Sequence, residues 1–456
     1  MSKDTGLVKG LGLVDATTLV MGSMIGSGIF IVSADIARQV QSPGSLLLTW
    51  VVTALLTIIA ALSYGELAAA MPHAGGQYVY LREAFGPLYG FLYGWTLFLV
   101  IQTGTVAAVA VAFAKYTGVF YPSISAGNWV LPFLNTQQAL AIFILLLLTW
   151  VNTRGLKTGS LVQNIFTFAK TGALLGLIGF GFLLGSNTAA VERNYGDFWG
   201  PARFDWNTIR LVGVAMVGAL FSSDAWNNVT FTAGEVRNPK RNLPLSLVLG
   251  VGIVSALYLA CNLVYLQALP LEQIQTAAQD RVATAVGLQI FGSLGVQLLA
   301  GAIMISTFGC VNGMLMAGAR VYYAMAQDKL FFRRAGELNA TSHAPTTSLW
   351  MQCAWACLLT MTGRYNDLLD YVIFAVLIFY ILTIAGIFVL RRTRPDMERP
   401  YKAIGYPVLP ILYIVIAGLI EILLLLYKPN YTWPGLIIVL LGIPVYFLWR
   451  KREDYA

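Results

Sequence analysis

Two apolar runs of membrane length in this chain are each interrupted by residues that disfavour a continuous helix. The first contains residues 22–30, which read GSMIGSGIF, and the second contains residues 221–226, which read FSSDAW. Lipid offers no hydrogen bonds, so irregular backbone at membrane depth is tolerated only where it is buried in protein or lines a water-filled cavity. Paired interruptions in the two halves of a membrane chain predict the substrate site of a secondary transporter.

The composition indicates an integral membrane protein. Of the 456 residues, 57% are hydrophobic and 11% are charged, whereas soluble domains carry about 25% charged residues. Apolar runs close to the roughly 20 residues that span a bilayer recur along the whole chain. We therefore expect one all-α domain over residues 1–456 with twelve transmembrane helices. The expected spans are 12–34, 44–70, 87–113, 130–152, 162–185, 208–233, 245–269, 295–319, 347–363, 368–390, 407–427 and 433–449.

The loop charges predict how this domain is oriented. With twelve spans both termini lie on one side, and most of the 29 Lys and Arg residues fall in loops on that side. Cytoplasmic loops are enriched in these residues, which predicts cytoplasmic termini in a multi-pass protein of the cell membrane. The net charge of +8 then reflects loops beside anionic lipid, and nucleic acid is not expected as a partner. The four cysteines lie in apolar runs without metal-ligand spacing, so neither a metal site nor a cofactor is expected.

The first interruption suits a zwitterionic ligand. Gly26, Ser27 and Gly28 can leave helical geometry at low energetic cost, because glycine lacks a Cβ atom. Unwinding exposes backbone N–H groups at the N-terminus of a half-helix, where a carboxylate binds. The carbonyl groups on the other side of the break face a cation. The alternative is close helix packing through Gly22 and Gly26, which have GxxxG spacing.

The second interruption carries an acid. A carboxylate within a membrane is unfavourable and marks a functional site by default, so Asp224 is a candidate contact for a substrate ammonium. Alternatively, Asp224 is a structural group that accepts hydrogen bonds from unwound backbone. Phe221 beside it is either a gate over the pocket or a lipid-facing aromatic residue.

Lys170 lies well inside the fifth apolar run and needs carbonyl or carboxylate partners there. It could act as a fixed positive charge in place of a bound Na⁺, or it could release its proton during a transport cycle. The alternative is that its side chain reaches the cytoplasmic surface. Glu421, in the eleventh run, has no explanation from the sequence.

Five motifs in order identify a family resemblance. The motifs are residues 22–30, residues 75–80 with Glu83, Gly86, Gly90 and Trp95, Glu235 with residues 238–244, residues 308–313, and Arg394-Pro395 with residues 398–400. Together they resemble the amino acid–polyamine–organocation superfamily and, within it, the L-amino-acid transporter family of exchangers. The resemblance runs from about Gly6 to Arg452.

This resemblance implies a LeuT-type fold with two inverted five-helix repeats, 12–185 and 208–390, and two further helices in 407–449. Helices 1 and 6 would be unwound at mid-membrane, and transport would proceed by alternating access. The implied substrate-binding residues are Met24, Ile25, Gly26, Ser27, Gly28, Phe221, Ser222 and Asp224. Within this set, the N–H groups of Ser27 and Gly28 would bind the carboxylate, and the carbonyls of Met24, Phe221 and Asp224 the ammonium. Phe221 would be the gate, and Lys170 would occupy the place of a sodium ion.

The expected function is sodium-independent exchange of L-amino acids, most simply small neutral ones. Asp224 stands at a position where some relatives handle cationic substrates, so exchange of cationic amino acids or polyamines is an alternative, as is proton-coupled symport. Animal members bond to a glycoprotein through a cysteine between helices 3 and 4. Residues 115–128 contain none, so no disulfide-linked heavy subunit is expected. Both histidines fall in loops, and no catalytic residues, and hence no enzyme, are expected.

Overall fold

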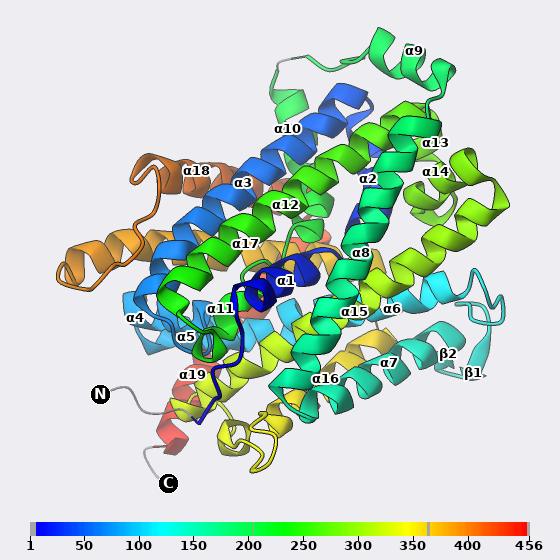
Figure 1. The fold of residues 1–456 in the computed structure, drawn as a ribbon. Coiled ribbons are helices and arrows are strands. Elements are labelled where there is room, and N and C mark those ends of the chain that lie inside the picture. Colours follow the sequence, from blue (N-terminus) through cyan, green and yellow to red (C-terminus); the bar gives the residue numbers. More distant parts are fainter. Residues whose placement is uncertain (1–5, 204, 363–364, 454–456) are drawn as a thin grey trace.

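The computed structural model describes residues 6–203, 205–362 and 365–453, which are mainly helical (Figure 1). The helices of the N-terminal half are α1 (Leu13–Met24), α2 (Gly28–Val40), α3 (Pro43–Ala70), α4 (Gln77–Phe85), α5 (Pro87–Thr96), the π-helical η1 (Leu97–Ile101), α6 (Gln102–Thr117), α7 (Thr136–Thr153), α8 (Leu156–Leu184) and α9 (Thr188–Gly196). A short antiparallel hairpin, β1 (Trp129–Leu131) with β2 (Leu134–Asn135), precedes α7.

The C-terminal half is also built from helices. Its helices are α10 (Trp206–Ser222), α11 (Asn228–Phe231), η2 (Ala233–Glu235), α12 (Pro239–Ala268), α13 (Leu271–Gln275), η3 (Ala278–Asp280), α14 (Val282–Phe291), α15 (Ser293–Gln327), η4 (Arg333–Gly336), α16 (Thr346–Thr362), α17 (Tyr365–Thr393), α18 (Val408–Tyr427) and α19 (Pro429–Glu453).

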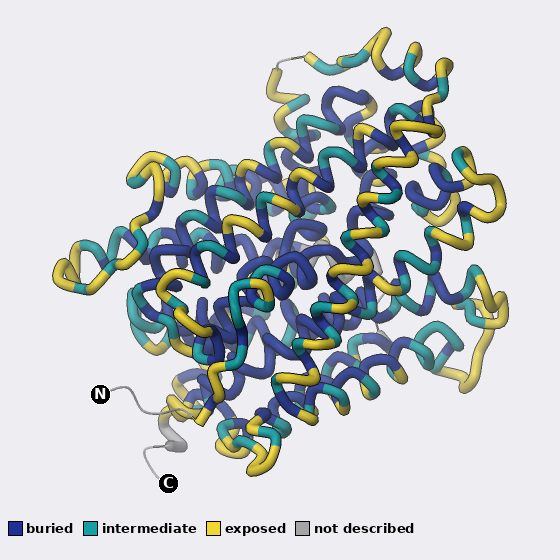
Figure 2. The backbone as a smooth tube through the Cα atoms, in the orientation of Figure 1, coloured by how far each residue is buried: buried dark blue, intermediate teal, exposed yellow. Residues whose placement is uncertain are grey.

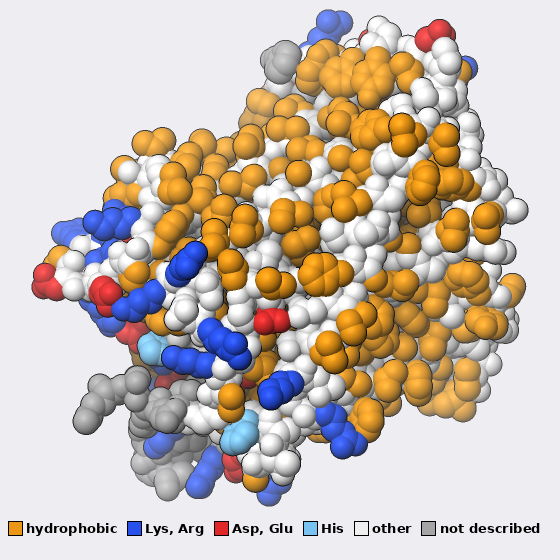
Figure 3. Space-filling view, viewed as in Figure 1, with side chains coloured by type: hydrophobic (Ala, Val, Ile, Leu, Met, Phe, Trp, Pro, Cys, Tyr) orange, Lys and Arg blue, Asp and Glu red, His pale blue; other side chains and the backbone are white. Residues whose placement is uncertain are grey.

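Membrane-spanning helices dominate the described residues. Within those residues, nine helices are long and apolar enough to cross a membrane, or ten if α1 and α2 form one bent span. The two other predicted spans correspond to α10, an apolar helix of 17 residues, and α16, also of 17 residues. The chain is therefore a multi-pass membrane protein. In Figure 3 the middle of the visible face is hydrophobic, and Lys and Arg side chains gather toward the end of the molecule where the chain starts and stops.

The helical path is interrupted at both places that the sequence marks. α1 ends at Met24 and α2 begins at Gly28, with a 40° bend between them. α10 ends at Ser222 and α11 begins only at Asn228. Ala225 lies in this second gap with a φ of 63°. This left-handed conformation costs a residue with a Cβ atom about 1–2 kcal/mol, so the gap is held open by its surroundings.

The interrupted helices occupy the centre of the fold. α1 packs against α8, α12 and α15, and α2 packs against α10. These central segments are buried, whereas exposed residues lie on the outer helices and the connecting loops (Figure 2). The two gaps are therefore enclosed by protein rather than by lipid.

Several predicted span boundaries differ from the helix ends: α8 begins at Leu156 rather than 162, and α12 begins at Pro239 rather than 245. Two further differences have a physical cause in the structure. The span predicted from residue 130 begins as α7 only at Thr136, because residues 129–135 form the hairpin and Asn135 caps the helix, its side chain accepting from Gln138 N at 2.9 Å. The span predicted to end at 319 continues as α15 to Gln327. Arg320 does not end it, because its guanidinium pairs with Glu235 at 2.9 and 3.0 Å and both side chains are 2% exposed.

Candidate functional site

Lys170 of α8 points into the protein and binds the carbonyl end of α1. Its Nζ donates to the carbonyl oxygens of Gly22 at 2.5 Å and Ile25 at 2.7 Å, and to that of Ser306 on α15 at 3.3 Å. The last carbonyls of a helix lack intrahelical partners and carry its partial negative charge. The ammonium therefore satisfies backbone groups that the interruption leaves open, and it does not reach the membrane surface.

Ser306 supports the same carbonyls from α15. Its Oγ lies 3.1 Å from the Ile25 oxygen and 3.0 Å from the Gly26 oxygen. A buried carbonyl without a partner costs about 1–3 kcal/mol. The first interruption is thus held by side chains from two helices, α8 and α15.

Tyr258 of α12 connects the two interruptions. Its hydroxyl lies 3.0 Å from the Met24 oxygen at the end of α1 and 3.0 Å from the Ser222 oxygen at the end of α10. Because one hydroxyl carries one proton, the two carbonyls share a single donor. The sequence offered no signal for this role, since tyrosine is common in apolar runs.

The two interruptions also touch directly. A Cβ atom placed on Gly28 would lie 2.8 Å from Ser222 Cβ and 2.9 Å from Ser222 Cα. The predicted residues of the two gaps are thus brought together, with α2 lying on α10. Ser222 therefore fills the space beside Gly28.

Asp224 lies in the second gap and accepts a hydrogen bond from the Tyr380 hydroxyl of α17, at 2.6 Å from its Oδ1. The acid lines two small cavities, one toward Asn227 and Asn228 and the other toward Trp226 and Tyr413. Phe221 is buried at 6% exposure but lines neither of them.

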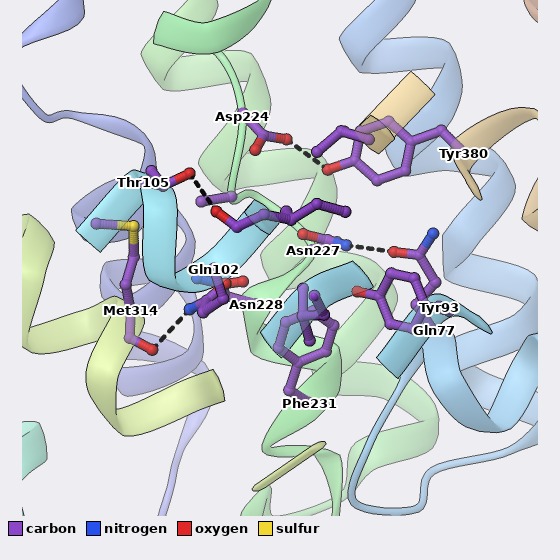
Figure 4. Close-up of a pocket in the computed structure, with 14 residues that line it drawn as sticks. Gln77, Tyr93, Gln102, Thr105, Asp224, Asn227, Asn228, Phe231, Met314 and Tyr380 are labelled. Carbon is purple, nitrogen blue, oxygen red and sulfur yellow. Dashed lines mark hydrogen bonds between the residues drawn. The ribbon is translucent and has the colours of Figure 1, made fainter. Parts of the chain in front are cut away.

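The first of these cavities is small, and its lining combines polar and apolar side chains (Figure 4). Its free volume is about 10 Å³, which is room for one water molecule. Asn227 donates to Gln77 Oε1 at 2.7 Å, and Gln102 donates to the Met314 oxygen at 2.7 Å. Asn228 also lines the cavity, and its Nδ2 is buried without a hydrogen-bond partner among the described residues. The residues lining this cavity therefore include both an unpaired amide donor and a carboxylate.

Six residues of this region were absent from the predicted set: Tyr258, Ser306, Tyr380, Gln77, Asn227 and Asn228. Gln77 lies in one of the five sequence motifs, and the two asparagines directly follow Trp226. These three could have been found by extending the marked segments. Over the part of the chain that the structure describes, no group of three His, Cys, Asp or Glu residues is arranged to hold a metal.

We predict that Gly28→Ala lowers the unfolding temperature, because the new methyl group meets Ser222 atoms closer than 3.0 Å. Overpacking of this kind typically costs about 1–3 kcal/mol. The control is Gly176→Ala on α8, where nothing lies within 4 Å of the added atom. Thermal unfolding of both variants in one detergent measures the difference. Equal unfolding temperatures would contradict the contact between the interruptions.

Comparisons with known proteins agree with this architecture. The family model for amino acid permeases matches residues 11–447. The human "Large neutral amino acids transporter small subunit 2" is 32% identical over 98% of this chain and 82% of its own. The "Serine/threonine exchanger SteT" of Bacillus subtilis (strain 168) is 29% identical over 99% of both chains, and the human "b(0,+)-type amino acid transporter 1" is 30% identical over 98% of this chain and 89% of its own. The chain belongs to the amino acid permease family.

Proposed function

We propose that this protein is a sodium-independent exchanger of small neutral L-amino acids, working by alternating access. The observation that carries the proposal is the contact between two helix interruptions, with Lys170 bound to the carbonyls of the first. Full-length similarity to proteins named as amino acid transporters and exchangers supports it. The proposed role is transport alone, without enzymatic activity.

The proposed membrane organisation has twelve spans, with α1–α2 and α10–α11 as the two interrupted ones at mid-membrane. The inverted repeats would cover 12–185 and 208–390, and α18 and α19 would be the additional pair within 407–449. Both termini would be cytoplasmic, in the cell membrane. The gathering of Lys and Arg at one end of the molecule supports this orientation.

In the proposed site, the substrate carboxylate binds at the N-terminus of α2, to the N–H groups of Ser27 and Gly28. The first N–H groups of a helix lack intrahelical acceptors and favour an anion. The substrate ammonium binds carbonyls at the ends of α1 and α10, those of Met24, Phe221 and Asp224. A carbonyl oxygen accepts two hydrogen bonds, so the present partner of Met24, Tyr258, leaves one position for the substrate.

Binding then requires α2 and α10 to separate. Ser222 fills the space beside Gly28, so a substrate seated there must push these helices apart or enter when they are apart. Phe221, at the end of α10, is the proposed gate of this movement. Substrate binding and helix movement are thereby one event, as alternating access requires.

The small cavity at the second gap, with Asp224 and Asn228 in its lining, favours a small substrate side chain with a polar group. The unpaired amide of Asn228 and the carboxylate of Asp224 could bind a hydroxyl group that both donates and accepts. A relative named as a serine/threonine exchanger supports this substrate class. Exchange of cationic amino acids or polyamines is the second candidate, because Asp224 is a buried acid.

Lys170 takes the proposed role of a fixed sodium substitute. It places a positive charge on the carbonyls of Gly22 and Ile25, where a sodium ion would otherwise neutralise them. No disulfide-linked subunit is part of the proposal, since residues 115–128 contain no cysteine.

Counterflow in proteoliposomes tests the function and the role of Lys170 together. Vesicles loaded with L-serine should take up labelled L-serine equally with and without Na⁺. Lys170→Met should reduce this exchange by about tenfold or more, since removing an ionic hydrogen bond costs about 1.5–3 kcal/mol. Lys157→Met, an exposed lysine at the start of the same helix, should leave exchange unchanged. Uphill uptake driven by a pH gradient alone would favour the proton-coupled alternative and overturn the proposal.

The substrate class is tested at Asp224. Asp224→Asn keeps an acceptor for the Tyr380 hydroxyl but removes the charge. We expect serine exchange to persist with an altered ranking of substrates, because backbone carbonyls bind the ammonium. Competition assays with L-serine, L-alanine, L-arginine and putrescine measure the ranking. If the affinity for every substrate fell by about ten- to a hundredfold, the value of one ionic hydrogen bond, the Asp224 carboxylate would instead be the ligand of the substrate ammonium.

A further inference from the structure

A broad groove lies away from the candidate site, between the last turn of α7, the loop 339–345 and the first turn of α16. α7 and α16 lie side by side (Figure 1). The groove has a volume of about 890 Å³ and includes Trp150, Arg154 and Trp350 in its lining. It belongs to neither of the cavities around Asp224.

Two exposed tryptophans indicate where this groove lies relative to the membrane surface. Trp150 lies three residues before the end of α7 and is 48% exposed, and Trp350 lies four residues after the start of α16 and is 42% exposed. Tryptophan is enriched where a membrane meets water. Both rings therefore mark the headgroup level at one end of the spans.

The upper part of the groove is polar and cationic. The guanidinium of Arg154 lies over the Trp150 ring, 4.4 Å from its centroid, and makes no ion pair within the described part of the chain. Hydroxyls of Thr341, Ser342 and Thr346 line the same space, and Ser342 Oγ is buried without a hydrogen-bond partner in the described ranges. No Asp or Glu belongs to the lining. This chemistry suits a phosphodiester with a hydroxylated headgroup.

The lower part of the groove opens onto an apolar surface. Ala354 lines it, and exposed apolar side chains continue along α7 at Phe143 and Leu146 and along α16 at Leu358. These residues recur at helical spacing on one face of each helix, as the walls along an acyl chain would. A polar, cationic recess above an apolar strip matches the two ends of a phospholipid.

We propose that this groove binds one anionic phospholipid of the leaflet on the Lys- and Arg-rich side, with its phosphate on Arg154 and its acyl chains along α7 and α16. The inference rests on the proposed membrane placement but not on the proposed substrate. Basic pockets between transmembrane helices on the cytoplasmic side bind anionic headgroups in this way.

Native mass spectrometry of the full-length purified protein tests the site without any transport measurement. Phosphatidylglycerol and phosphatidylcholine are titrated separately. The fraction of protein that carries one bound lipid gives the affinity for each. We expect phosphatidylglycerol to bind more tightly. Arg154→Gln should weaken it about fivefold, the effect of one interfacial cation, and the preference over phosphatidylcholine should fall. The matched control is Lys157→Gln, which removes the same charge three residues further on, outside the groove lining.

Several results would overturn the proposal. One is an equal loss in the Arg154 and Lys157 variants, which would indicate only general attraction to the charged end. Another is glycerol 3-phosphate displacing the lipid at similar concentration, which would assign the site to a free phosphate. A third result is a wild-type protein that forms dimers and retains no lipid, while the Trp350→Leu variant stays monomeric. This result would assign the face to a second copy of the chain. Trp350→Leu with weakened phosphatidylglycerol binding and an unchanged unfolding temperature would support the lipid site.

Discussion

The hydrogen bonds from Lys170 to the end of α1 are the interaction on which the centre of this fold depends. An interrupted helix in a membrane protein leaves carbonyl groups without partners, and lipid cannot supply them. Here an ammonium from α8 and a hydroxyl from α15 do so, at 2.5–3.1 Å. Because these donors come from different helices, the interruption ties α1, α8 and α15 into one unit.

The second interruption is joined to the first by Tyr258 and by the contact of Gly28 with Ser222. Any movement that separates α2 from α10 must therefore break a shared hydroxyl contact and open the space beside Gly28. This coupling is the physical basis for linking substrate binding to a change of conformation. It also explains why the cavity beside Asp224 is small: the described structure holds the two interruptions together.

The sequence predicted much of this arrangement from local chemistry. The apolar runs indicated the membrane class, and the residues GSMIGSGIF and FSSDAW marked the two gaps, because glycine, serine and aspartate are poor choices inside a spanning helix. The partners of the gaps were not predictable in the same way. Tyr258 and Tyr380 are aromatic residues in apolar runs, and their roles depend on which helices pack together. The end of α15 was not predicted, because an arginine such as Arg320 usually marks the end of a membrane span. Only the structure shows that Glu235 pairs with it inside the protein.

Glu421 is a buried acid with no hydrogen-bond partner in the part of the chain that the structure describes. Its two carboxylate oxygens are buried on α18 and make no hydrogen bond among the described residues, and we have no physical account of it. Lys170 has hydrogen-bond acceptors around its ammonium, whereas the described residues provide no donor to the Glu421 carboxylate. Its neighbour two turns earlier, Tyr413, lines the second cavity around Asp224.

The most direct test of the coupling between the two interruptions is the exchange rate of Tyr258→Phe relative to Tyr265→Phe. Both tyrosines lie on α12, but among the described residues the Tyr265 hydroxyl donates only to the Ile29 carbonyl oxygen of α2, at 3.2 Å, and does not join the two gaps. If the Tyr258 hydroxyl joins the two gaps, its loss should change exchange several-fold, in line with the ~1 kcal/mol of one hydrogen bond, while Tyr265→Phe keeps the wild-type rate. Wild-type exchange in Tyr258→Phe, or the same change in both variants, would contradict the account.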